Sequence, residues 1–177
     1  EESTSYEGVT KPVEEGGLGF HFKWNMGWMN DSLDYLETDP LFRGGIHHQF
    51  TFSMMYAFTE NYILPISHDE VVHGKKSLVD KAPVSYEDKF ANYRAFMGYM
   101  IAHPGKKLNF MGNEIPQIIE WNEERELDWF LLKYPIHDAT HLYVKDLNAF
   151  YKKHSELWQL DGGWSGFRWH EVQDIWN

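Results

Sequence analysis

Apolar positions along the chain follow two spacings, one typical of helices and one typical of buried strands. Apolar residues at three- or four-residue spacing predict helices, at about residues 29–36, 47–60, 88–103 and 138–151. Short apolar or aromatic runs between them predict strands, at residues 17–25, 62–66 and 107–114. Asp138 is the expected N-cap of the last helix. Because strands and helices alternate, we expect an α/β fold with a parallel sheet wrapped by helices.

Polar or charged side chains follow each predicted strand. They are Lys23, Trp24 and Asn25, then His68, Asp69 and Glu70, then Asn113 and Glu114. In a (β/α) barrel the carboxyl ends of the strands carry the chemistry, so this shared habit indicates one functional rim.

Both ends of the sequence resemble cut points. The chain begins with Glu1, not Met, and ends within an alternating apolar pattern. Gly162 and Gly163 break the pattern of the last helix, and the residues that follow read as β structure. We therefore expect a segment of a longer protein, with one domain at residues 1–160 and the start of another at 161–177.

Composition removes several classes of function. The 177 residues carry a net charge of −11, which disfavours nucleic acid as a partner. No apolar run is long enough to span a membrane, and no signal peptide is visible. The chain has no cysteine, which fits a reducing compartment, and we expect a cytoplasmic protein.

A metal site is an unfavourable interpretation of the histidines. His68 and His73 are five residues apart, whereas the helical zinc motif places two histidines four residues apart on one face. The adjacent His47 and His48 diverge on a helix in the same way. We expect no metal and no cofactor.

Carboxylates at the strand ends offer a different chemistry. Glycoside cleavage uses a general acid and a second carboxylate on either side of the sugar bond, and Asp69 and Glu114 are placed for such work. Eight tryptophans give weak support, because flat rings stack on sugars but more often fill cores. Neither a G-x-S-x-G serine elbow nor a phosphate-binding glycine loop is present.

Several blocks, in order, carry a resemblance to a known family. They are "GGLGFHFKWNMGWMNDSLDY", "LPISHDEVVHGKKSL", "KFANYRAFMGYMIAHPGKKLNFMGNE" and "EWNEERELDW". The sequence resembles the 1,4-α-glucan branching enzymes of the α-amylase superfamily, glycoside hydrolase family thirteen. The resemblance implies the C-terminal half of a (β/α)8 TIM barrel, from the end of strand five to strand eight, followed by the start of an all-β C-terminal domain.

The resemblance also implies roles for individual residues. Glu1 would be the general acid/base, and Asp69 the third carboxylate, which stabilises the transition state and binds ring hydroxyls. His68 would bind the sugar in the same subsite. Further residues would line or support the glucan groove: Lys23, Trp24, Asn25, Glu114 and Trp121.

One part of the family's machinery is not found in this sequence. The nucleophilic aspartate of the family ends strand four in a block like "RVDAV", and no such block occurs here. A retaining double displacement needs that residue. We therefore expect the chain to need the remainder of its parent, to be inactive alone and, as a half barrel with open edges, to be poorly soluble.

Two alternatives stay open. An α-glucan hydrolase or debranching enzyme of the same superfamily would share the barrel, although the residues after Asp69 resemble branching enzymes more. A glucan-binding module without chemistry would keep the groove and lack the nucleophile.

Overall fold

The fold is built on a small parallel sheet. The computed structural model describes residues 6–173. Three strands lie in the order β1 (Lys23–Trp24), β2 (Tyr62–Ile66) and β3 (Lys106–Asn109), and each pairs in parallel with its neighbour. Because all three strands run in the same direction, their carboxyl ends share one edge. The α/β class predicted from the alternating pattern is confirmed.

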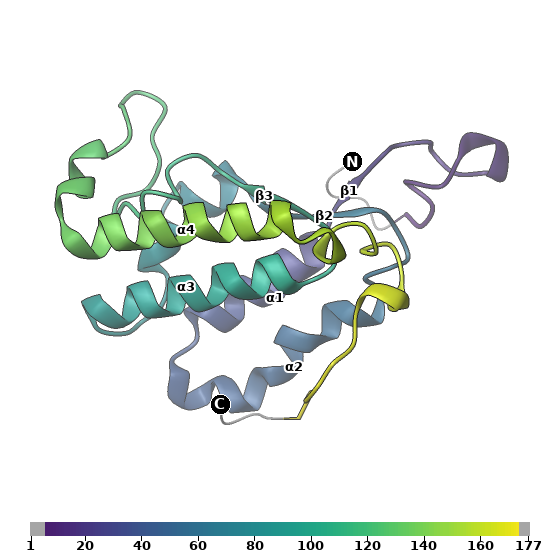
Figure 1. Ribbon diagram of the computed structural model, residues 1–177, viewed down its shortest axis with the longest axis horizontal. Coiled ribbons are helices and arrows are strands. Elements are labelled where there is room, and N and C mark those ends of the chain that lie inside the picture. The colour runs from purple at the N-terminus through teal and green to yellow at the C-terminus, as the bar shows by residue number, and fades with distance from the viewer. Residues whose placement is uncertain (1–5, 174–177) are drawn as a thin grey trace.

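Four α-helices connect and cover these strands. They are α1 (Met26–Glu37), α2 (His47–Thr51), α3 (Tyr86–Ala102) and α4 (Pro135–Lys153). Helices α3 and α4 pack against each other and lie side by side along the molecule, while α1 follows β1 directly and contacts β2 (Figure 1). None of the helices in residues 6–173 is long and apolar enough to cross a membrane.

The core forms where α1 and α3 meet next to the sheet. Trp28 of α1 is fully buried, and its Nε1 donates to the Tyr99 hydroxyl of α3 at 3.1 Å. The Tyr99 ring stacks on Phe50 with centroids 3.7 Å apart. Leu64 and Ile66 of β2 are also fully buried. This aromatic and aliphatic core orients the first two strands and fixes where their carboxyl ends point.

Side chains cap the starts of two helices, and the one N-cap predicted from the sequence is not observed. Asn25 Oδ1 caps α1 by accepting from the Trp28 backbone N–H at 2.9 Å, and the Ser85 side chain caps α3. The predicted N-cap Asp138 is wrong, because α4 begins at Pro135. Proline suits the first turn, since its fixed φ is helical and it has no N–H to leave unpaired.

The first predicted strand is shorter than expected. Residues 17–22 are not part of the sheet, and only Lys23–Trp24 pairs with β2. The backbone N–H groups of Leu18 and Phe20 donate instead to carbonyls of Gly8 and Val9. This local pairing uses the donors that a longer strand would need.

The second predicted helix also ends early. Helix α2 stops at Thr51, and a 3-10 turn, Phe52–Met55, follows. The tighter turn directs Ser53 inward, where its Oγ lies 2.8 Å from His103 Nε2. A buried polar contact thus replaces further α-helical turns of a segment rich in aromatic residues, which are weak helix formers.

Between Gly163 and residue 173, where the described part of the chain ends, the only regular element is a short 3-10 turn, Trp164–Gly166. Residues 164–173 include no strand, so the expected β structure is not seen in this range. The proposed domain boundary near residue 160 stays a prediction.

Candidate functional site

The chain turns sharply as it leaves β2, and this turn presents two polar side chains. His68–Val71 form a 3-10 turn with Ser67 as its N-cap. Glu70 Oε2 accepts from the Ser67 backbone N–H at 2.6 Å and from the Ser67 hydroxyl at 2.7 Å. This capping box buries Glu70 and fixes the turn, while the side chains of His68 and Asp69 each stay 52% exposed.

His68 lies between Asp69 and two aromatic rings. Its Nε2 is 3.4 Å from Asp69 Oδ1. Its ring centroid lies 5.8 Å from that of Phe110, which follows β3, and 6.3 Å from that of Trp121. Phe110 and Trp121 meet edge to face with centroids 5.1 Å apart. A carboxylate, an imidazole and an indole therefore meet beside the carboxyl ends of β2 and β3, a combination suited to a sugar with hydroxyl edges and apolar faces.

A pocket of about 610 Å³ opens beside these rings. We call it the histidine pocket; it is lined by His68, Val72, His73, Glu120, Trp121, Asn122, Glu123 and Glu124. Three carboxylates give it an acidic character, which favours a neutral polyhydroxy ligand over an anion.

Glu120 is the most constrained of these carboxylates. It accepts from the backbone N–H of Lys76 at 2.7 Å and of Gly74 at 3.1 Å. The hydrogen bonds from Gly74 and then Lys76 lower the pKa of Glu120, because they favour its charged form.

The predicted residues in and just after β1 make contacts that stabilise the fold. Lys23 is buried, and its Nζ donates to the Tyr6 carbonyl at 3.0 Å. Asn25 is buried and caps α1, but its Nδ2 has no hydrogen-bond partner within residues 6–173. Trp24 is half-buried and pairs through its backbone with Ile63. Of these three side chains, Asn25 retains a donor that a ligand or another part of the protein could use.

Glu114 is separated from the histidine pocket. Its Oε2 accepts from the Gly112 N–H at 2.9 Å, and its side chain lines a different pocket, against α4. The structure therefore brings Asp69, His68 and Trp121 together but places Glu114 elsewhere. Glu1, the predicted acid/base, lies outside the described residues.

Several lining residues were not singled out from the sequence. Phe110, Asn122 and Glu120 reach the site from β3 and its loop. The sequence feature that could have indicated them is the polar, tryptophan-containing loop directly after a strand end. A stretch of four glutamates between residues 120 and 126 gave no means of choosing among them.

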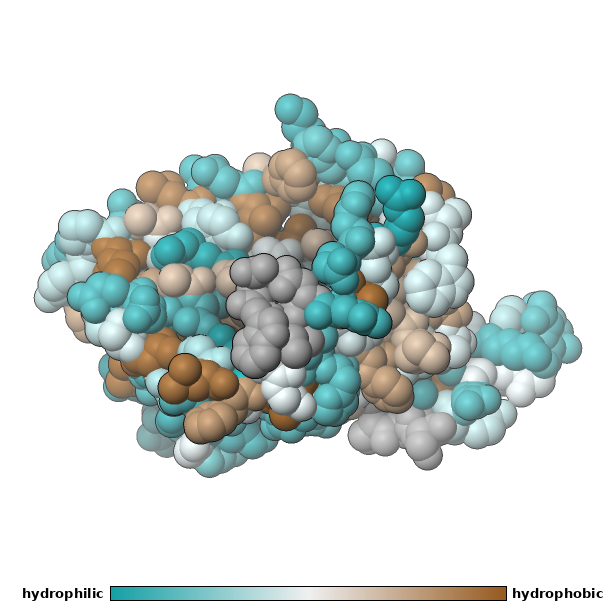
Figure 2. Space-filling model, turned by 90° about the horizontal axis from the view of Figure 1, so that it is seen from below, coloured by the Kyte–Doolittle hydropathy of each residue, from teal (hydrophilic) through white to brown (hydrophobic). Residues whose placement is uncertain are grey.

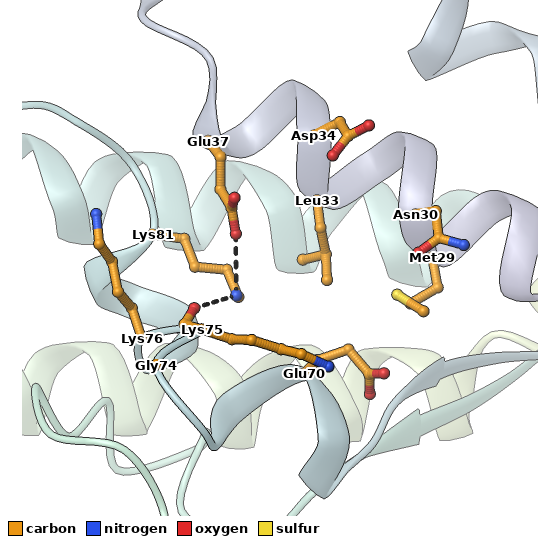
Figure 3. A pocket seen from close by; sticks show the side chains of 10 residues that line it. All are labelled: Met29, Asn30, Leu33, Asp34, Glu37, Glu70, Gly74, Lys75, Lys76 and Lys81. Carbon is orange, nitrogen blue, oxygen red and sulfur yellow. Dashed lines mark hydrogen bonds and ion pairs between the residues drawn. The ribbon is translucent and has the colours of Figure 1, made fainter.

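A second pocket, of about 360 Å³, lies between α1 and the loop after the His68 turn (Figure 3). We call it the lysine pocket. Lys81 and Glu37 point toward each other across it, with Nζ 3.0 Å from Oε1. Lys81 Nζ also donates to the Lys75 carbonyl at 2.6 Å. This buried ammonium links the loop to the last turn of α1.

Residues 6–173 contain no cluster of three or more histidine, aspartate or glutamate side chains arranged to hold a metal ion.

Comparison with known proteins gives close relatives along nearly the whole chain. The chain is 56% identical over 174 residues to the 1,4-alpha-glucan branching enzyme GlgB of Desulfitobacterium hafniense, and 60% identical over 175 residues to GlgB 1 of Clostridium perfringens SM101. The predicted resemblance is confirmed. The branching enzyme of Geobacillus stearothermophilus is 52% identical over 174 residues. No protein-family model matches the chain.

These branching enzymes are much longer than the chain. The matches cover 98% of this chain but only 28%, 26% and 27% of the three relatives. The chain thus corresponds to about a quarter of a branching enzyme, and the histidine pocket lies within that quarter.

Proposed function

We propose that the chain is part of a 1,4-α-glucan branching enzyme, which cleaves an α-1,4 bond and transfers the released chain to a 6-hydroxyl. The observation that carries this proposal is the meeting of Asp69, His68 and Trp121 beside the carboxyl ends of parallel strands. Identity of 52–60% to relatives that are named as branching enzymes supports the same reading. The strands would be the sixth, seventh and eighth of a (β/α)8 barrel, and the site would lie at its functional rim.

The proposed reaction is a retaining double displacement in which Glu1 and Asp69 have different tasks. An aspartate from another part of the protein attacks C1, the C1–O4 bond breaks, and Glu1 protonates O4. The 6-hydroxyl of an acceptor chain then attacks C1 and gives its proton to Glu1, and the bond to the aspartate breaks. Asp69 binds ring hydroxyls most strongly in the charged transition state, and His68 holds the same sugar.

The other predicted residues have supporting tasks in this proposal. Trp121 offers a ring face to the glucan, and Asn25 contributes its unpaired Nδ2. Trp24 and Lys23 support the wall of the groove from β1, and Glu114 supports it from outside the histidine pocket, next to α4. The 177-residue chain by itself is inactive, since the nucleophile comes from elsewhere. The same proposal places the intact protein in the cytoplasm.

The test is branch formation by the intact protein that contains this segment. Incubation with amylose should yield new α-1,6 linkages, measured by proton NMR and by chain release with a debranching enzyme. Asp69→Asn should lower kcat about a thousandfold or more, because it removes charge stabilisation of the transition state. Asp34→Asn is the matched control, since Asp34 is exposed on α1 and lines the lysine pocket.

Three results would contradict the proposal. Release of reducing sugar without new α-1,6 linkages would show a hydrolase. Glucan binding without any bond cleavage would show a binding module. An Asp69→Asn protein as active as the Asp34→Asn control would remove Asp69 from the mechanism.

A further inference from the structure

Hydrogen bonds tie the loop after β2 to the loop after β3 at four places. The Trp121 N–H donates to the Val71 carbonyl at 3.1 Å, and the Ser77 hydroxyl donates to the Ile118 carbonyl at 2.9 Å. Between these two contacts, Glu120 accepts from the backbone N–H groups of Gly74 and Lys76. Glu120 thus supplies the two middle hydrogen bonds between the loops, and other groups make the hydrogen bonds at either end.

The segment that Glu120 holds has an unusual backbone. His73, Gly74 and Lys76 have φ values of 57°, 84° and 65°, all in the left-handed region. Residues other than glycine adopt this region at a cost in free energy, so the backbone at His73 and Lys76 needs stabilising contacts from outside the segment. The backbone N–H groups of Gly74 and Lys76 donate to the Glu120 carboxylate, and these two hydrogen bonds provide that support.

This segment also separates the two pockets. His73 lines the histidine pocket, whereas Gly74, Lys75 and Lys76 line the lysine pocket. Figure 3 shows the segment along one side of the lysine pocket, opposite α1. Because His73 belongs both to this segment and to the lining of the histidine pocket, a displacement of residues 73–76 would change the shape of that pocket.

The turn that carries Asp69 is held independently of this segment. Ser67 and Glu70 form their own capping box, and Asp69 donates its N–H to Ser67 Oγ at 3.3 Å. Loss of the Glu120 hydrogen bonds would thus loosen residues 73–76 and leave the Asp69 turn in place. Binding of a ligand in the pocket should suffer, and the chemistry at Asp69 should not.

We propose that Glu120 is a positioning residue that fixes residues 73–76 as a wall of the glucan-binding pocket. The proposal rests on the proposed function, because it names the pocket as the place where the glucan chain binds. Glu120 itself acts through the backbone of the loop, so its effect belongs to KM and not to kcat.

The experiment compares Glu120 with Glu126 in the intact protein. Both glutamates lie in the loop after β3, and Glu126 is exposed and is not among the residues that line the histidine pocket. Glu120→Ala removes both acceptor oxygens, Glu120→Gln keeps one, and Glu126→Ala and Glu126→Gln remove the same charge without removing an acceptor for residues 73–76. Hydrogen exchange at residues 72–77 and initial rates against amylose concentration are measured for each variant, and circular dichroism checks that each is folded.

We expect a graded effect at position 120 alone. Exchange of the Gly74 and Lys76 amides should rise about tenfold or more in Glu120→Ala and less in Glu120→Gln. KM should rise about fivefold in Glu120→Ala, with kcat within about twofold of the wild-type protein. Both Glu126 variants should resemble the wild-type protein.

Other results would overturn the positioning role. Equal exchange and equal KM in Glu120→Ala and Glu126→Ala would show that the loop keeps its conformation without Glu120. A fall in kcat as large as the fall in kcat/KM would place Glu120 in the chemistry or in general stability. If the wild-type protein forms no α-1,6 linkages, the proposed function fails independently of the role of Glu120. Two measurements then test the positioning role: amide exchange at residues 72–77, and the dissociation constant for maltoheptaose.

Discussion

The buried histidine His103 makes the free energy of unfolding depend on pH. His103 Nδ1 lies 2.8 Å from the Pro104 carbonyl and Nε2 lies 2.8 Å from Ser53 Oγ. A carbonyl only accepts, so Nδ1 carries the proton and Nε2 accepts from Ser53. Burial lowers the pKa of His103 to about 4, and nearby Lys107 adds to this effect. His103 is therefore neutral in the folded protein at pH 5 to 7.

This arrangement predicts a loss of stability in mild acid. The unfolded state takes up the proton at a pKa of about 6.5, before the folded state does, so the free energy of unfolding falls as pH falls from about 6.5 to 4. Between pH 7 and pH 5 the loss from this group should be about 2 kcal/mol, measured by urea unfolding. His103→Gln should show a smaller loss over the same range, because glutamine does not titrate. Equal losses in both proteins would contradict the role of His103.

Single residues also show what the sequence could and could not predict about the site. Asp69, His68 and Trp121 were found because they sit at or just after apolar runs or in familiar blocks, and the structure brings them together. Glu120 was not distinguished from the other glutamates of its loop. Its acceptor role depends on amides 44 and 46 residues away, which only the folded chain brings near.

At the scale of elements, local signals set most helices but not all of their ends. The apolar spacing predicted α1 and α3 to within three residues of their observed ends, because both helices bury one apolar face. Helix α4 has a cap without a side-chain hydrogen bond and a proline at its start, so Asp138 looked like a cap from sequence alone. The 3-10 turn after α2 makes a contact with His103, 50 residues along the chain, and β1 is shortened by backbone pairing of residues 18 and 20 with residues 8 and 9. Apolar spacing encodes neither feature.

The two candidate caps differ in a way that mutation can measure. Ser85 Oγ accepts from the Asp88 N–H at 3.3 Å and donates to Asp88 Oδ2 at 2.7 Å. Asp138 lies within α4, where its own N–H already donates to the Tyr134 carbonyl at 3.0 Å. Ser85→Ala should lower the free energy of unfolding by about 1 kcal/mol, and Asp138→Ala by less than about 0.5 kcal/mol. Urea unfolding tests this, and a larger loss for Asp138→Ala would contradict the observed start of α4.

At the scale of the whole molecule, the described sheet has two open sides. Strand β1 pairs with β2 on one side only, and β3 does the same, within residues 6–173. Large apolar side chains are also exposed near α2: Leu41 is 83% exposed, Met55 77% and Phe42 69%. Figure 2, which views the molecule from the side of α2, shows hydrophobic side chains in several groups among hydrophilic ones.

These features predict that the 177-residue chain, expressed alone, associates with itself. Unpaired strand edges add further strands readily, and exposed apolar groups lower the cost of contact between copies. Size-exclusion chromatography with light scattering should give a mass well above 21.0 kDa. Leu41→Lys combined with Met55→Lys separates the two causes: association that persists comes from the strand edges, and association that disappears comes from the apolar surface. A monomer of 21.0 kDa with one sharp melting transition would contradict both causes and would show that the sheet needs no further strands.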